Sequence, residues 1–194
     1  MVKCDEYVNP LIALGANLDG PAGRPAASLI AALDQIAALP GVTLHAVSRF
    51  WRSPAWPIGA GPDFVNAACA VTTTLPASRL LEALHRIEAD LGRVRQHRWG
   101  ARAVDLDLIA YGAALLPDAA TAAHWRDLPP EAQTQETPDR LILPHPRMQD
   151  RGFVLLPLAE IAADWRHPAL GASVAELAAR LSDAARQGLE PFQP

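Results

Sequence analysis

Four short stretches of the chain carry the apolar, β-branched and aromatic residues that are typical of strands. They cover residues 11–15, 42–51, 63–74 and 104–111. The first stretch follows Pro10, which a strand tolerates only at its start. Short apolar runs bounded by proline, glycine and other turn residues are typical of strands in a buried sheet, so we predict four strands.

Three longer stretches repeat apolar residues three or four positions apart, which places them on one face of a helix. They cover residues 25–39, 76–91 and 173–185. Pro25 can occupy the first turn of the first helix, and Gly92 suits the position just after the second. The third helix begins with the Ser-x-x-Glu sequence of a capping box.

The first six predicted elements follow the order strand, helix, strand, strand, helix, strand, which is the ferredoxin-like split βαβ arrangement. We therefore predict an α+β fold with a ferredoxin-like βαββαβ core. Its sheet is expected to be mainly antiparallel, with helices packed on one face and an extra C-terminal helix that covers more of it. We expect a single domain over residues 1–194. Residues 117–138, rich in Ala, Thr, Pro, Asp and Glu, are predicted to be a loop excursion without an assigned function.

Composition limits the classes of protein that this chain resembles. Hydrophobic residues make up 50% of its 194 residues, which is typical of a globular protein, and the net charge is −4. A nucleic-acid binder is more often basic overall. Cys4 and Cys69 form no zinc or disulfide pattern. Without a signal peptide or a membrane-length apolar run, we expect a cytoplasmic monomer with no membrane or nucleic-acid partner.

The positive charge is concentrated in residues 92–102, just before the fourth predicted strand. This segment holds four arginines, and the strand then carries Asp105 and Asp107. Residues two apart on a strand share a face, and paired carboxylates suit Mg²⁺, which usually accompanies substrate phosphates. Arginine forks bind phosphate oxygens. A solvated strand face would explain the two aspartates alone, and a soluble loop would explain the arginines alone. The two features side by side favour a nucleoside triphosphate site with metal.

The same segment resembles a family signature. Gly-Arg-Val-Arg at 92–95, Arg-Trp-Gly-Ala-Arg at 98–102 and Asp-Leu-Asp at 105–107 closely resemble the motif of the 6-hydroxymethyl-7,8-dihydropterin pyrophosphokinase family. Residues 141–146 and 151–155 match a second motif of that family. The resemblance spans roughly residues 11–165, except for the excursion. It implies ATP, two Mg²⁺ ions and transfer of pyrophosphate to a pterin alcohol in folate biosynthesis.

The resemblance also implies roles for individual residues. It places Asp105 and Asp107 on the metals, and Arg93 and Arg102 at the developing charge. The other residues that it assigns to ATP are His85, Glu88, Arg95, Arg98, Trp99, Leu108, Arg140, His145 and Arg151. The residues that it assigns to the pterin are Ser53, Pro54, Trp56, Phe64, Asn66 and Phe153.

Some residues depart from the family pattern, and some have plainer explanations. Ala16 replaces a serine, Trp56 replaces a smaller apolar residue, and His85 replaces a residue that is often glutamine. His85 and Glu88 are also three apart on a helix, where a solvated face is the simpler interpretation. Phe64 and Asn66 are two positions apart and therefore share a strand face. The amide of Asn66 offers both a hydrogen-bond donor and an acceptor, which matches the donors and acceptors on the edge of a pterin.

Two other classes of function remain open. An RNA-recognition module has the same strand order, but the chain lacks the aromatic-rich motif of such modules, and the aspartates at 105 and 107 would repel phosphate without metal. A non-catalytic relative retained for an interaction is the second. The presence of the arginines, both aspartates and Asn66 argues against it.

Overall fold

The computed structural model describes residues 7–55, 59, 61–93, 102–129, 132 and 136–193. Its strands are β1 Pro10–Ala16, β2 Val42–Val47, β3 Phe50–Ser53, β4 Phe64–Thr73, β5 Asp105–Tyr111 and β6 Glu190–Phe192. Its helices are α1 Pro25–Ala37, α2 Ala77–Asp90, α3 Ala119–Asp127, the 3₁₀ helix η1 Met148–Asp150, α5 Gly152–Ile161, α6 Val174–Ala179 and α7 Asp183–Arg186.

The sheet confirms the predicted antiparallel, ferredoxin-like order. Its path runs β5-β1-β4-β3-β6, β2 also pairs with β4, and these strand pairings are all antiparallel. The strand predicted over 42–51 is two strands. Ser48 lies between them. Its hydroxyl oxygen accepts the Ala68 N–H of β4 at 2.9 Å, a bond that a backbone carbonyl would accept in a continuous strand ladder. The C-terminal strand β6 was not predicted.

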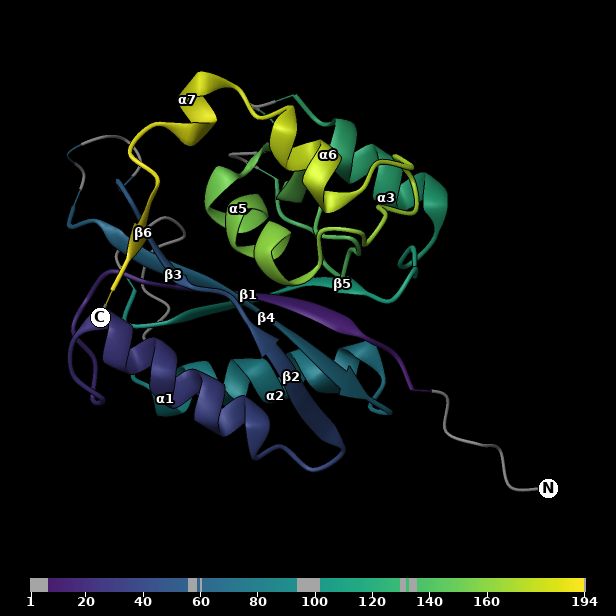
Figure 1. Ribbon diagram of the computed structural model, residues 1–194. Coiled ribbons are helices and arrows are strands. Elements are labelled where there is room, and N and C mark those ends of the chain that lie inside the picture. The colour runs from purple at the N-terminus through teal and green to yellow at the C-terminus, as the bar shows by residue number, and fades with distance from the viewer. Residues whose placement is uncertain are drawn as a thin grey trace.

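Helices cover both faces of the sheet, which corrects the expectation of one covered face (Figure 1). On β1, Ile12 and Leu14 pack toward α1 and α2, while Leu11 and Ala13 pack toward α5 and α6. The sequence pattern missed α5 because this helix is apolar almost all round, as a helix buried between two layers is, and shows no amphipathic period.

Two other segments differ from their sequence interpretation. The helix predicted over 173–185 is α6 followed by α7. α6 ends at Ala179, and α7 begins after Ser182, whose hydroxyl oxygen accepts the Ala185 N–H. The predicted capping box at the start of α6 is present. The loop interpretation of 117–138 is wrong for its first part, where α3 begins behind Asp118, whose carboxylate accepts the Thr121 N–H at 2.9 Å.

None of the described helices is both long enough and apolar enough to cross a bilayer.

A buried histidine between α5 and α6 makes stability depend on pH. His167 is 3% exposed, and its Nδ1 accepts the N–H groups of Ala169 and Leu170 at 3.2 and 3.3 Å. Burial, followed by the charge of Arg126, lowers the pKa of His167 from 6.5 to about 4. Between these two pKa values the unfolded chain binds more protons than the folded chain, so the free energy of unfolding falls as pH falls.

We expect His167 to account for a loss of about 2 kcal/mol in the free energy of unfolding between pH 7.5 and pH 5. His167→Asn, which keeps an acceptor, should remove this part of the slope in denaturant titrations at both pH values. His45→Asn, a change at an exposed position of β2, is the control. An unchanged slope in His167→Asn would contradict the assignment.

Candidate active site

An asparagine in the turn after β1 ties together three parts of the site. The Oδ1 of Asn17 accepts the Arg102 N–H at 2.8 Å, and its Nδ2 donates to the Pro62 carbonyl at 3.1 Å. The backbone N–H groups of Asn17 and Leu18 donate to the Arg102 carbonyl at 3.0 and 3.2 Å. Asn17 is only 4% exposed. This side chain therefore sets where the chain enters β5.

The sheet register aligns a carboxylate and an amide on either side of a glycine. Asp105 of β5 pairs with Gly15 of β1, and Gly15 pairs with Asn66 of β4. Paired residues point to the same face of a sheet, here the α5 face. A Cβ atom on Gly15 would lie 3.4 Å from the Asn66 Oδ1, in van der Waals contact, so the amide lies directly over this glycine. Two strand spacings separate their backbones by roughly 10 Å.

The two aspartates lie on this face, as the period of two predicts, and arginines neutralise them. The Oδ1 of Asp105 is 2.7 Å from the Arg93 Nη1, and its Oδ2 pairs with Arg102. The Oδ2 of Asp107 is 3.8 Å from the Arg151 Nη1. Two arginines of the segment 92–102 and Arg151, which is distant in sequence, therefore converge on one pair of carboxylates.

Two carboxyl groups at this end of the sheet have raised pKa values. Burial raises the pKa of Asp105, the charge of Asp107 raises it further, and Arg102 and Arg93 oppose the shift. Burial raises the pKa of Glu88 to about 7, although the Leu106 N–H and Arg93 favour its charged form. The two aspartates are thus close enough to repel each other, and added positive charge between them would be stabilising.

Glu88 corrects the interpretation of its helix face as solvated. It is 1% exposed, and its Oε1 accepts the Leu106 N–H at 2.8 Å and pairs with Arg93. The sequence pattern missed this because the carboxylate lies beneath the start of β5, a contact that α2 alone does not show. His85, three residues earlier, is exposed.

His145 lies beside the same strand end in its neutral form. Its backbone N–H donates to the Ile109 carbonyl at 2.8 Å, and its Nδ1 accepts the Arg147 N–H at 3.1 Å. Burial, followed by the charges of Arg151 and Arg147, lowers the pKa of His145 to about 3. With Nδ1 acting as an acceptor, Nε2 carries the ring hydrogen and is the donor that this side chain can offer.

Three of the residues assigned to the pterin, Ser53, Phe64 and Asn66, lie next to one another on β3 and β4. Asn66 is 4% exposed and donates from Nδ2 to the Ser53 Oγ at 2.9 Å, and Ser53 pairs with Phe64 across the β3–β4 ladder. Phe153, in the first turn of α5, is 38% exposed. The Arg151 guanidinium lies 5.6 Å from the centre of its ring.

Some predicted residues lie elsewhere. Leu108 points to the opposite face of β5 and is 4% exposed in the core, so only its backbone could contact ATP. Arg140 is paired with its exposed neighbour Asp139. Four predicted residues lie outside the described part of the chain: Trp56, Arg95, Arg98 and Trp99.

The donor set fits a hard divalent cation with a phosphate partner. In the described part of the chain, no cluster of three acidic, histidine or cysteine side chains could hold a metal. Two carboxylates on one face suit Mg²⁺, which keeps several waters and takes further oxygens from substrate phosphates. The repulsion between Asp105 and Asp107 is what such a cation would relieve.

Comparisons with known proteins identify the family of this chain. The family model for 7,8-dihydro-6-hydroxymethylpterin-pyrophosphokinase (HPPK) matches residues 11–163. Proteins named 2-amino-4-hydroxy-6-hydroxymethyldihydropteridine pyrophosphokinase match from Methylorubrum extorquens (40% identical over 153 residues) and Pseudomonas aeruginosa (42% over 159 residues). These matches cover 79% and 81% of this chain and 82% of each relative.

A structural comparison supports the fold. The crystal structure of wild-type Plasmodium falciparum HPPK-DHPS matches with a TM-score of 0.61 at 11% identity, over 90% of this chain and 45% of that chain. This chain therefore spans less than half the length of that protein. From the match over residues 11–163 and the identities of its relatives, the chain belongs to the HPPK family.

Proposed function

We propose that this protein transfers pyrophosphate from ATP to the hydroxymethyl group of 6-hydroxymethyl-7,8-dihydropterin and releases AMP, a step of folate biosynthesis. The row Asp105–Gly15–Asn66 carries the proposal, since the register puts the carboxylate that we assign to the metal and the amide that we assign to the pterin on one sheet face. The names of the relatives from two bacteria support the same reaction.

The reaction forms one bond and breaks one bond at the β-phosphorus of ATP. The hydroxymethyl oxygen of the pterin attacks and loses its proton, and the bond between that phosphorus and the oxygen it shares with the α-phosphate breaks, so that AMP leaves. Such transfers depend on positioning and on neutralisation of charge more than on covalent catalysis. Arg93 and Arg102, which both pair with Asp105, are the residues that we assign to the developing charge.

Binding of ATP would exchange the partners of the charged groups. Asp105 and Asp107 would hold the metal, which we propose to be two Mg²⁺ ions. When bound, these ions would neutralise and orient the triphosphate. Arg93, Arg102 and Arg151, now paired with those carboxylates, would turn to the phosphate oxygens. The neutral His145 would donate from Nε2.

We assign the pterin to the space beside Asn66, between Phe64 and Phe153. The Asn66 amide offers both a donor and an acceptor to the edge of the ring. Each aromatic stack contributes about 0.5–1.5 kcal/mol beyond the burial of area.

Asn66→Ala should weaken pterin binding about 5- to 150-fold, because an unpaired polar edge of the ring costs about 1–3 kcal/mol. ATP binding should stay nearly unchanged. Calorimetric titration of each substrate checks this, with Asn9→Ala, a change at an exposed position of the chain leading into β1, as the control. Equal weakening for both substrates would contradict a role confined to the pterin.

One assay tests the reaction itself. The protein is incubated with ATP, Mg²⁺ and 6-hydroxymethyl-7,8-dihydropterin, and AMP and the pterin diphosphate are quantified by chromatography. Formation of both in equal amounts is expected. Formation of ADP in place of AMP would contradict pyrophosphate transfer.

A further inference from the structure

The last part of the chain packs on both sides of the proposed pterin site. It lies beyond residue 163, where the match to the HPPK family model ends. We name residues 185–192 the C-terminal strap. It comprises the end of α7, the turn at Gly188 and the strand β6, and it runs along β3 at the edge of the sheet (Figure 1).

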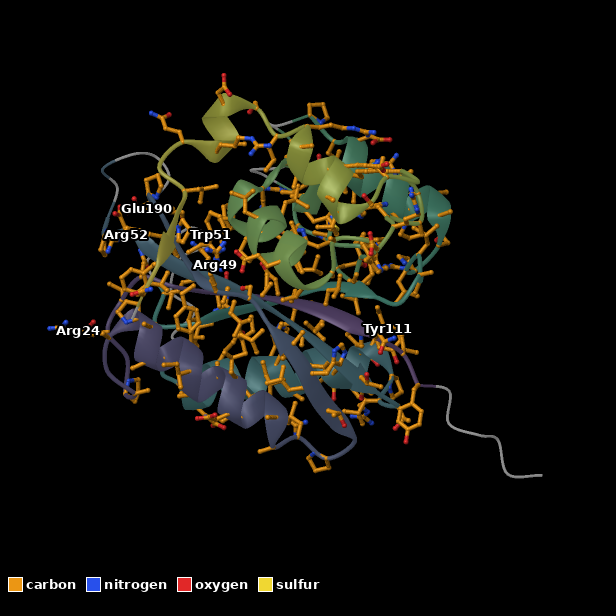
Figure 2. The ribbon with its side chains drawn as sticks, viewed as in Figure 1. Arg24, Arg49, Trp51, Arg52, Tyr111 and Glu190 are labelled. Atoms are coloured by element: carbon orange, nitrogen blue, oxygen red, sulfur yellow. The ribbon has the colours of Figure 1, made fainter. Side chains whose placement is uncertain are left out.

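On one side, the strap holds the strand that carries Ser53. β6 pairs with β3 in the register Phe50↔Phe192, Trp51↔Pro191 and Arg52↔Glu190. Arg52 and Glu190 form an ion pair of 3.3 Å at this edge, where Figure 2 shows both side chains. The Arg52 guanidinium also lies 5.0 Å from the centre of the Phe192 ring. Without β6, β3 would be an unpaired edge strand.

The turn of the strap touches the residue that follows β3. Gly188 has φ +70°, and a Cβ atom on it would lie 3.0 Å from the Pro54 Cδ and 3.2 Å from the Cγ. Backbone and proline ring are therefore in direct contact. Pro54 directly follows Ser53, whose hydroxyl oxygen accepts the Asn66 amide.

On its other side, the strap packs against the start of α5. A Cβ atom on Gly152 would lie 2.1 Å from the Ala185 carbonyl oxygen and 2.6 Å from the Leu189 Cδ1, so no side chain fits there. Gly152 lies between Arg151, which faces the aspartates, and Phe153, assigned to the pterin. The strap thus contacts Pro54 on one side of the proposed pterin site and Gly152, at the start of α5, on the other.

We infer that the C-terminal strap positions the pterin site by holding the Ser53–Pro54 wall at a set distance from the start of α5. The inference rests on the proposed function. The aspartates of β5 lie at the opposite end of the strand order from β6, and Gly188 of the strap contacts Pro54, so a change at Gly188 is expected to act on the pterin side. A preformed pocket binds a rigid ligand more tightly because less ordering is needed on binding.

Two glycines provide a matched pair of variants. Gly188 and Gly171 have φ values of +70° and +67°, so alanine strains the backbone equally at both. A Cβ atom on Gly171 meets nothing within 4 Å, whereas a Cβ atom on Gly188 presses on Pro54. The two alanine variants therefore differ in the contact between strap and pocket wall.

The test compares steady-state kinetics of Gly188→Ala, Gly171→Ala and the unsubstituted chain. In Gly188→Ala, the KM for the pterin should rise about fivefold, while kcat and the KM for ATP change less than about twofold, because loss of uniform binding appears in KM. Gly171→Ala should leave all three values unchanged.

An equal pterin KM in the two variants would overturn the positioning role. A parallel rise in both KM values would also overturn it, since general loosening of the fold would produce that. If the unsubstituted chain formed no AMP, the proposed function would fail, and the inference with it. That outcome is distinguishable because it appears before any substitution is made.

Discussion

Asp105→Asn and Asp107→Asn should each lower the rate of AMP formation by at least about 10³-fold, because loss of several kcal/mol of charge stabilisation in the transition state has that effect. Asparagine keeps the shape of the side chain but cannot balance the charge of Mg²⁺. Asp105 also loses the carboxylate that pairs with Arg93 and Arg102. The measurement is single-turnover AMP release at saturating Mg²⁺.

Asp34→Asn is the control for this pair, since it removes the same charge from an exposed position on α1. It should keep the full rate. Denaturant midpoints of the variants separate loss of catalysis from loss of folding. Near-normal rates in both variants of β5 would show that neither carboxylate binds a catalytic metal, and the metal part of the proposed function would be wrong.

Arg102→Ala should lower kcat by about 10²–10³-fold and change the affinity for ATP much less, as expected for a group that acts on charge developing in the transition state. The backbone of Arg102 should keep its place because Asn17 holds its N–H and carbonyl groups and not its side chain. Steady-state kinetics together with equilibrium ATP binding separate the two effects.

Two further variants define what the Arg102 guanidinium contributes. Arg102→Lys retains the charge without the planar fork, so it should recover part of the rate at most. Arg79→Ala removes an exposed arginine of α2 that pairs with Glu82 and should have no effect. A fall in ATP affinity with unchanged kcat would make Arg102 a nucleotide-binding residue without a role in charge stabilisation.

Several features of the site could be predicted from short stretches of sequence. The period of two in β5 placed Asp105 and Asp107 on one face, and the structure has them there. The glycine expected after α2 has φ +86° and packs against Pro21. Each of these depends on residues a few positions apart, whose relative directions follow from one helix or strand alone.

Other features depend on segments that are distant in sequence. Asn17 reaches Arg102 across 85 positions, and Glu88 is buried by the backbone of Leu106. The pattern of α2 shows only that Glu88 lies on a given side of a helix. Whether that side meets water or another strand depends on how the layers pack.

The sequence by itself determined the strands β1, β4 and β5, the two helices after β1 and β4, the family and the grouping of arginines beside two aspartates. Only the tertiary structure decided that α5 lies between the sheet and α6, that β6 closes the edge beside β3, and that Asp105, Gly15 and Asn66 form one row. The physical reason is that periodicity records which side of an element is apolar, whereas register and layer order depend on free energies of contact between elements that no single segment contains.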